Sequence, residues 1–295
     1  MSQESTKLGP PWTTLKILRW TQGYFEKNGI DNARFEAELL LSHALDLQRM
    51  MLYAYFERPL AKDELDTFRA MVKRRVADEP VAYITGSRGF WSIDLKTDGR
   101  ALIPRPDTET LVSGALDFLP EGEAKRVLDI GTGTGAVALA LAHDRPEIEV
   151  AATDISADAL ALARENAEEL ELTERVTFFE GDLLDALSGD WSSGTIDVIV
   201  SNPPYVGTSE MDLMDESVKK YEPESALYAG EDGLDVIRRL VPQAFDRLEE
   251  GGHFLCEIGF RQGEAVKQLF EEQGFQEVKV LRDLGKNDRV VVGRR

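Results

Sequence analysis

Cysteine and long apolar runs are the two features this sequence most clearly lacks. The one cysteine, Cys256, excludes an internal disulfide and a cysteine-rich zinc site. No apolar stretch reaches about 18 residues and the first 20 residues carry no signal-peptide pattern, so we expect no membrane span and no secretion. These absences predict a cytoplasmic globular protein, and 295 residues are enough for two domains.

Positive charge is scarce in one part of the chain. Residues 1–90 hold 13 Lys and Arg against 12 Asp and Glu, whereas the remainder holds 21 against 42, a net charge of −21. Because affinity for phosphate backbones comes largely from Lys and Arg, the acidic part is poorly suited to duplex nucleic acid. A generally acidic proteome would also explain this charge, and both explanations stay open. The change near residue 90 marks a composition boundary.

The N-terminal part carries apolar residues at helical spacing and few glycines. We expect one helix that ends near Asn28, a second whose apolar stripe starts at Phe35, and a third from about Leu60 to Val76. The basic run Lys73-Arg74-Arg75 fits either a solvated helix end or a docking surface. We therefore assign residues 1–88 to a helical, substrate-docking domain.

From Arg126 onward, apolar strands alternate with helices, which predicts an α/β fold with a doubly wound, mostly parallel sheet. Before it, Phe90–Leu95, a turn at Asp98-Gly99 and Ala101–Ile103 predict a β-hairpin, so residues 89–104 are assigned to a linker and 105–295 to the second domain. In such sheets, ligands bind beyond the carboxyl ends of the strands. Seven strands are expected: Val127–Ile130, Glu149–Asp154, Val176–Glu180, the strand that ends at Asn202, His253–Ile258, Val278–Leu281 and Val290–Val292.

The apolar strand 196–201 runs directly into Asn202-Pro203-Pro204-Tyr205. Two successive prolines lack N–H donors and fix φ, so the strand cannot continue and the tip is rigid before anything binds. The tip offers the Asn202 side-chain oxygen, the Pro203 carbonyl and the flat ring of Tyr205. Two acceptors and one aromatic face can hold a planar –NH2 group by its hydrogens and direct its lone pair at an electrophile. We interpret these four residues as catalytic and substrate-binding; a loop that merely ends a strand is the alternative.

A glycine-rich turn, Gly131-Thr132-Gly133-Thr134-Gly135, follows an earlier strand and opens a helix. Its glycines let a ligand approach the backbone, but the third comes one position earlier than in a dinucleotide fingerprint, which argues against NAD. Asp129, just before the turn, would repel a pyrophosphate and attract an ammonium or sulfonium group. The turn therefore predicts a different nucleoside cofactor.

Two further carboxylates follow the next strands. Asp154 is placed to accept both hydroxyls of a ribose, and Asp182 can accept from an adenine amine, although either could instead cap a helix or turn. With the glycine loop and Asp129, they describe S-adenosylmethionine, its methyl group directed toward Asn202. This chemistry requires no metal, and we expect none.

The run Pro104-Arg105-Pro106-Asp107-Thr108-Glu109 places an arginine in a stiff segment before a helix. We expect Arg105 either to line the substrate mouth or to clamp the following helix. After the tip, the polar segment Gly207–Lys220 is expected to be a lid.

These motifs resemble the class I S-adenosylmethionine-dependent methyltransferases that act on planar amino groups. More narrowly, the chain is similar to the bacterial release factor glutamine methyltransferases (the PrmC or HemK family) over nearly its whole length. The residues that carry this resemblance are Glu79-Pro80-x-x-Tyr83-Ile84-x-Gly86, Phe90-Trp91, Ile103 with the Pro104–Glu109 run, and Tyr221-Glu222-Pro223-x-x-Ala226-Leu227.

The resemblance implies methylation of the glutamine side chain in the Gly-Gly-Gln loop of peptide chain release factors. We separately expect a monomer without direct nucleic-acid or membrane partners. The family's cofactor residues carry over to residues 131–135, Asp154 and Asp182, and we add Asp129 and Asn202. Leu183 stands where some relatives have a tryptophan against the adenine. The substrate-amide site carries over to residues 202–205, and we add Arg105.

Three rival functions stay open. A methyltransferase for a ribosomal-protein glutamine would share the cofactor and the chemistry and differ in its N-terminal domain and loops. A DNA adenine methyltransferase would use the same tetrapeptide but must also flip a base and grip phosphates. A non-catalytic protein that binds release factors would not need the tetrapeptide intact.

Overall fold

The computed structural model describes residues 11–295. The chain divides into two compact units, Met1–Gly86 and Ser87–Arg295, and each is described by itself.

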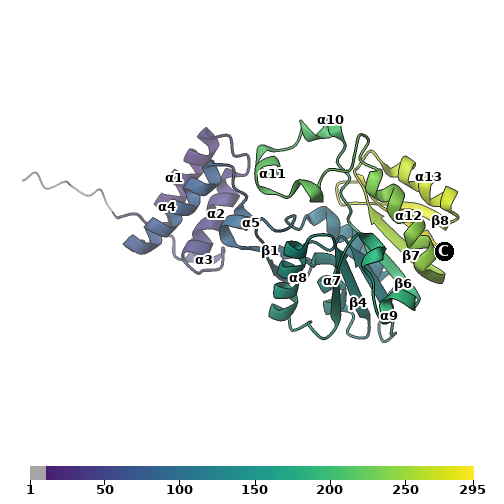
Figure 1. The fold of residues 1–295 in the computed structure, drawn as a ribbon. Helices are drawn as coiled ribbons and strands as arrows, with labels where there is room; N and C mark the ends of the chain where they lie inside the picture. Colours follow the sequence, from purple (N-terminus) through teal and green to yellow (C-terminus); the bar gives the residue numbers. More distant parts are fainter. Residues whose placement is uncertain (1–10) are drawn as a thin grey trace, which may run out of the picture. The chain divides into compact units, whose positions relative to one another are not determined.

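The first unit, in its described residues, is a group of five helices around one apolar core (Figure 1). Phe25, Leu40 and Phe68 are among its fully buried side chains. The Thr13 side chain caps the first helix by accepting a hydrogen bond from the Lys16 N–H. The helices are α1 (Thr14–Lys27), α2 (Ala33–Ala44), α3 (Met51–Ala54), α4 (Lys62–Val76) and α5 (Val81–Thr85).

The apolar stripe expected to start at Phe35 is correct in part, because Leu40 and Leu45 of that stripe are buried while Phe35 is not. Phe35 is 46% exposed and lies beneath the Arg49 guanidinium, while the buried face of α2 carries Ala33, Ala37 and Leu40. Ala33 and Ala37 pack inward together with Leu40, so the large apolar side chain of Phe35 does not mark the start of the buried face. In the basic run, Arg75 pairs with Glu36 and Arg74 with Glu79, so both arginines serve contacts within this unit.

A two-stranded hairpin opens the second unit, with β1 (Ser87–Phe90) paired to β2 (Ile93–Lys96). The expected turn at Asp98-Gly99 is present, because the Ala101 N–H donates to the Asp98 carbonyl at 3.4 Å. It does not join the strands of the hairpin, however, and the expected strand at 101–103 is wrong, since the chain of the hairpin reverses at Trp91-Ser92. Trp91 takes a φ of +53° there, and its ring N–H donates to Asp144 at 2.6 Å. A tryptophan in the left-handed region carries no turn signal in the sequence, since glycine and asparagine are the usual markers.

The core of the second unit is a seven-stranded sheet in the order β5-β4-β3-β6-β7-β9-β8. Neighbouring strands are parallel except that β9 runs antiparallel to both β7 and β8. The expected doubly wound, mostly parallel sheet is confirmed. Its strands are β3 (Arg126–Ile130), β4 (Glu149–Asp154), β5 (Val176–Glu180), β6 (Ile196–Ser201), β7 (Leu248–Glu257), β8 (Gln276–Arg282) and β9 (Asp288–Arg294).

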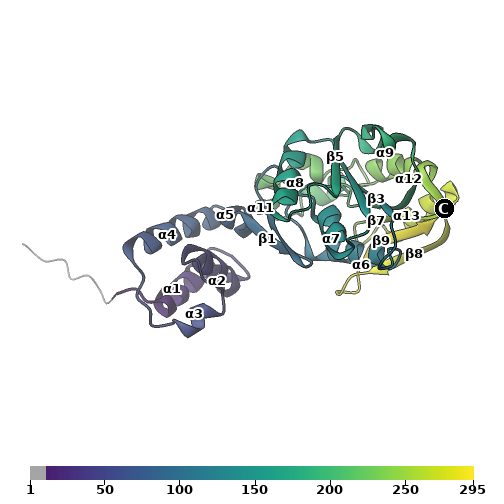
Figure 2. The same cartoon turned by 90° about the horizontal axis from the view of Figure 1, so that it is seen from below.

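Helices cover both faces of this sheet (Figures 1 and 2). Val127 faces α6 (Glu109–Leu116), α7 (Ala136–Asp144) and α8 (Ala157–Glu169), while Leu128 faces α12 (Asp235–Arg247) and α13 (Gly263–Gln273). Strands buried on both faces read as continuous apolar runs. The shorter helices are η1 (Pro106–Thr108), η2 (Leu183–Ala186), α9 (Asp190–Ser193), α10 (Thr208–Met211), α11 (Glu216–Tyr221) and η3 (Glu224–Ala226).

The strand register brings the predicted polar motifs to one edge. Ile130, the last residue of β3, pairs with Thr153 on one side and Ser201 on the other. The glycine loop, Asp154 and Asn202, each one step further along its own strand, therefore share the carboxyl edge of the sheet. None of the helices formed by residues 11–295 is both long and apolar enough to cross a membrane.

Candidate active site

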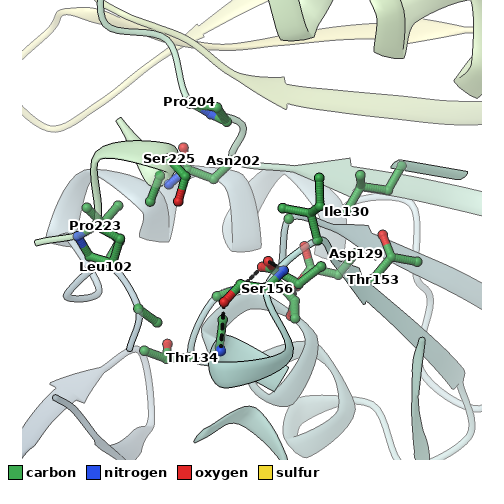
Figure 3. A pocket seen from close by; sticks show the side chains of 18 of the residues that line it. Leu102, Asp129, Ile130, Thr134, Thr153, Ser156, Asn202, Pro204, Pro223 and Ser225 are labelled. Carbon is green, nitrogen blue, oxygen red and sulfur yellow. Dashed lines mark hydrogen bonds between the residues drawn. The ribbon is translucent and has the colours of Figure 1, made fainter. Parts of the chain in front are cut away.

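A cavity of about 310 Å³ lies at this carboxyl edge, lined by 31 residues of the second unit. In Figure 3, Asn202 and Pro204 stand on one side of it and Asp129, Ile130 and Thr153 on another. Of the predicted site residues, those that line the cavity are Arg105, Asp129, Gly131, Thr132, Gly133, Thr134, Asp154, Asp182, Leu183, Asn202 and Pro204. Gly135, Pro203 and Tyr205 are not part of the lining.

The glycine loop bends around the end of β3. The N–H groups of Gly131 and Thr132 both donate to the Thr153 carbonyl, at 2.8 and 3.0 Å. Gly131 and Gly133 have φ values of +72° and +58°, and a Cβ added at either would meet no atom closer than 3.9 Å. The loop therefore requires glycine for its backbone conformation and leaves open space beside it.

Asp129 fixes the conformation of the glycine loop through hydrogen bonds. Its Oδ2 accepts from the Thr132 hydroxyl at 2.7 Å and from the Ala138 N–H, in the first turn of α7, at 3.1 Å. Burial raises the pKa of Asp129 to about 6, against the lowering effect of these two hydrogen bonds. The carboxyl group thus braces the turn that was expected to receive a cofactor.

Asp154 connects the end of β4 to the same loop. Its two oxygens accept from the N–H groups of Gly133 and Ser156, each at 2.9 Å. Burial raises the pKa of Asp154, and the backbone hydrogen bonds oppose the increase. Each carboxylate oxygen has more than one acceptor position, so both can still accept a hydroxyl from the cavity side.

Asp182 has a partner that sequence reasoning missed, the guanidinium of Arg239 on α12. Both side chains are about half exposed at the cavity wall. Leu183, the next residue, takes a φ of +51°, in a region that few residues other than glycine enter. The apolar side chain at the cavity wall is therefore presented by a strained backbone.

Within the tetrapeptide, Asn202 and Pro204 line the cavity, whereas Tyr205 makes its hydrogen bonds away from it. Asn202 lines the cavity and its Nδ2 donates to the Thr108 hydroxyl at 3.2 Å. The Tyr205 hydroxyl donates to Glu257 Oε1 at 3.4 Å, and the Tyr205 carbonyl accepts from Gln262 at 3.0 Å. Burial raises the pKa of Tyr205. This tyrosine anchors the turn through its hydroxyl and its backbone.

Glu257, at the end of β7, is fully buried behind the tetrapeptide. Burial raises its pKa to about 7, while hydrogen bonding from Thr108, the charge of Arg289 and the bond from Tyr205 oppose the increase. Among the described residues, its Oε2 has no hydrogen-bond partner. Arg289 is in turn paired with Asp283 and Asp107, each at 3.1 Å.

Arg105 lines the cavity and pairs with a distant carboxylate. Its Nη2 donates to Glu222 Oε1 at 2.6 Å, and Glu222 also accepts from the Ile103 N–H at 3.1 Å. The arginine therefore clamps the loop after α11, and not the helix that follows it in the sequence. The Val206 N–H donates to the Leu227 carbonyl at 2.9 Å, which closes the base of the segment expected to be a lid.

Sequence reasoning missed the supporting residues Thr108, Glu222, Glu257, Gln262 and Arg239. Two of them stood inside motifs that were recognised, and only their neighbours were given roles. An acidic residue at the end of the apolar run 254–258 was the available signal for Glu257. Among residues 11–295, no group of three or more His, Cys, Asp or Glu side chains is placed to hold a metal ion.

Comparison with known proteins agrees with this geometry. A PrmC N-terminal domain model matches residues 16–86, and a methyltransferase small domain model matches residues 109–221. The release factor glutamine methyltransferase of Geobacter sulfurreducens is 44% identical over 283 residues, which cover 96% of this chain and 97% of that protein. The enzyme of the same name from Rhodopirellula baltica is 40% identical and covers 95% of this chain and 96% of its own.

A solved methyltransferase structure from Pyrococcus furiosus has a TM-score of 0.51 at 21% identity, over 77% of this chain and 96% of that one, and shares the fold. The sheet order and the glycine loop at its carboxyl edge define a class I methyltransferase. Within that class, the chain belongs to the release factor glutamine methyltransferase family. The resemblance in the sequence motifs is confirmed.

Proposed function

We propose that this chain transfers a methyl group from S-adenosylmethionine to the side-chain amide nitrogen of the glutamine in the Gly-Gly-Gln motif of peptide chain release factors. One observation carries this proposal. Asn202, with its N–H group already bonded to Thr108, stands in the wall of the cavity that the glycine loop also lines. Its oxygen remains to accept from a substrate amide.

The residues present suit the cofactor. The space beside Gly131 and Gly133, where any Cβ would project, admits a ligand against the backbone. We assign Asp154 to the ribose hydroxyls, and the region of Asp182 and Leu183 to the adenine. When bound, S-adenosylmethionine supplies an electrophilic methyl group on a positively charged sulfur, and buried Asp129 contributes negative potential near the loop.

The tetrapeptide Asn202-Pro203-Pro204-Tyr205 is proposed to bind and orient the substrate amide. An amide nitrogen is a poor nucleophile because its lone pair is delocalised into the carbonyl. We assign the Asn202 side-chain oxygen and the Pro203 carbonyl to the two amide hydrogens, which fixes the nitrogen and stabilises positive charge developing on it. Tyr205, held by Glu257 and Gln262, keeps this turn rigid. We expect the amide proton to leave to water after the transfer.

The helical unit is proposed to dock the protein substrate, as residues 1–88 were assigned from the sequence. Its surface carries several exposed aromatic rings, which are enriched where proteins bind one another. Trp20 is 50% exposed and stacks on Tyr24 at 5.1 Å, and Tyr53 is 56% exposed. The −21 charge of residues 91–295 favours a protein substrate over duplex DNA.

Transfer of a labelled methyl group tests this function. The substrates are a purified release factor, the same factor with its Gly-Gly-Gln glutamine changed to alanine, a ribosomal-protein preparation and duplex DNA. We expect label on the intact factor alone. Asn202→Ala should lose most of the turnover while cofactor affinity falls less; label on ribosomal protein or DNA, and not on the factor, would reject the proposal.

A further inference from the structure

We infer that Arg239 and Gln243 are positioning residues that hold residues 182–184 in the conformation that binds adenine. The inference rests on the proposed function, in which Asp182 and Leu183 receive the adenine of S-adenosylmethionine. Neither Arg239 nor Gln243 touches the reacting atoms in this scheme. Both lie on α12 and act through the segment that they hold.

The segment contains a residue in a strained conformation. Leu183 lines the cavity and has a φ of +51°, a region in which a side chain is disfavoured. Such a conformation persists only where the surrounding structure fixes the backbone. One fixed point comes just before it, because the Gly181 N–H donates to the Asp154 carbonyl at 2.9 Å. This bond holds the start of the segment and leaves the rest to other contacts.

Helix α12 supplies those contacts from two residues that are four positions apart. The Arg239 guanidinium pairs with Asp182 Oδ2. Gln243 Oε1 accepts from the Leu184 N–H at 3.3 Å. Positions four apart lie on one face of a helix, so a single face of α12 holds the residues immediately before and after Leu183. The strained leucine is thereby fixed from both sides.

The ion pair also determines what Asp182 offers to a ligand. Arg239 occupies Oδ2, while Oδ1 has no hydrogen-bond partner among residues 11–295. An ionised carboxylate only accepts hydrogen bonds and the adenine amine donates them, so Oδ1 suits that amine. Holding one oxygen restricts rotation of the carboxylate and thus the direction in which the other faces. Because both side chains are about half exposed, the pair adds little to stability, and its effect should appear in ligand selectivity.

The test compares the Kd values of two ligands on each variant by isothermal titration calorimetry. One ligand is S-adenosylhomocysteine, and the other is its analogue with hydrogen in place of the 6-amino group of the adenine. The unsubstituted enzyme should prefer the first on the order of tenfold, the effect of one hydrogen bond to a charged group. We expect this preference to fall to about twofold in Arg239→Ala and in Gln243→Met, because Oδ1 is no longer held toward the amine. In the Asp182→Ala background, Arg239→Ala should not change it further.

Loss of folded protein affects both ligands alike and cancels in the ratio, so a merely structural role would leave the preference unchanged. The matched control is Arg238→Ala, the adjacent arginine on α12, which pairs with Asp232 and does not line the cavity. It should retain the full preference.

An unchanged preference in Arg239→Ala or in Gln243→Met would overturn the role of that residue, and an equal fall in Arg238→Ala would overturn the inference. Arg239→Gln, judged by the same criteria, replaces the alanine variant if that variant does not fold. If the unsubstituted enzyme binds S-adenosylhomocysteine without preferring the amine, the inference fails. If it does not bind S-adenosylhomocysteine at all, the proposed function fails instead.

Discussion

Arg105 and Glu222 form an ion pair of 2.6 Å in which the carboxylate is 1% exposed and the guanidinium 34% exposed. The pair joins the segment before α6 to the loop after α11, and both segments contribute to the cavity wall. Glu222 also accepts from the Ile103 N–H. One buried carboxylate therefore makes two hydrogen bonds to the segment that precedes α6. The Arg105–Glu222 ion pair therefore helps to keep these two parts of the cavity wall in place.

Arg105→Ala should destabilise the second unit and open the cavity wall. Removing the arginine leaves the Glu222 carboxylate buried without its partner, which costs about 1–3 kcal/mol after allowance for the partial exposure of Arg105. Glu222→Gln in the Arg105→Ala background should recover part of the loss, because the buried charge is gone. Urea unfolding monitored by circular dichroism measures both changes.

The matched control for this pair is Arg282→Ala. Arg282 is 68% exposed and pairs with Asp288 at 3.1 Å, so its removal should cost less than about 1 kcal/mol. Similar losses for Arg105→Ala and Arg282→Ala would contradict the role of the buried pair.

Glu257 should make stability depend on pH. Burial is the largest cause of its raised pKa, Asp107 adds to it, and Thr108, Arg289 and Tyr205 oppose it. Because the folded-state pKa of about 7 lies above the ordinary value of 4.5, the folded protein binds this proton more tightly than the unfolded chain. The resulting stability is fully present below about pH 4.5 and is lost as pH rises through 7.

The measurement compares the unsubstituted protein with Glu257→Gln, which is neutral at every pH. Between pH 4.5 and 8, the unsubstituted protein should lose about 3 kcal/mol more unfolding free energy than the variant. Other titrating groups are common to both proteins, so the difference isolates Glu257. Parallel stability curves for the two proteins would show that the Glu257 carboxyl titrates normally and would contradict this prediction.

Gly133→Ala should weaken cofactor binding. Alanine at a φ of +58° costs roughly 1–2 kcal/mol of backbone strain, and the added methyl group occupies the open space beside the loop. We expect at least a tenfold rise in the Kd for S-adenosylhomocysteine, about 1.4 kcal/mol, by isothermal titration calorimetry.

Gly23→Ala is the control with the opposite sign. Gly23 lies inside α1, and an added Cβ meets nothing within 4 Å. Alanine should stabilise that helix by roughly 0.5–1 kcal/mol and leave the Kd unchanged. An unchanged Kd for Gly133→Ala would remove the loop from the cofactor site.

Local patterns in the sequence determined the strands, the glycine loop and the rigid tip. Glu149–Asp154 and Val176–Glu180 were predicted with the bounds of β4 and β5, because a short apolar run flanked by polar residues is a local signal of a strand. Two adjacent prolines and positive-φ glycines likewise act on their own backbone. These features can therefore be predicted from neighbouring residues in the sequence alone.

The tertiary structure alone decided which side chains meet. Arg105 and Glu222 lie 117 positions apart, Thr108 and Asn202 lie 94 apart, and Tyr205 and Glu257 lie 52 apart. Each contact depends on the order and register of β6 and β7 and on the path of the loops, which no local pattern contains. The hairpin turn at Trp91 was hidden for the same reason, since bonds to Asp144 and Glu109 hold a conformation that tryptophan seldom adopts by itself.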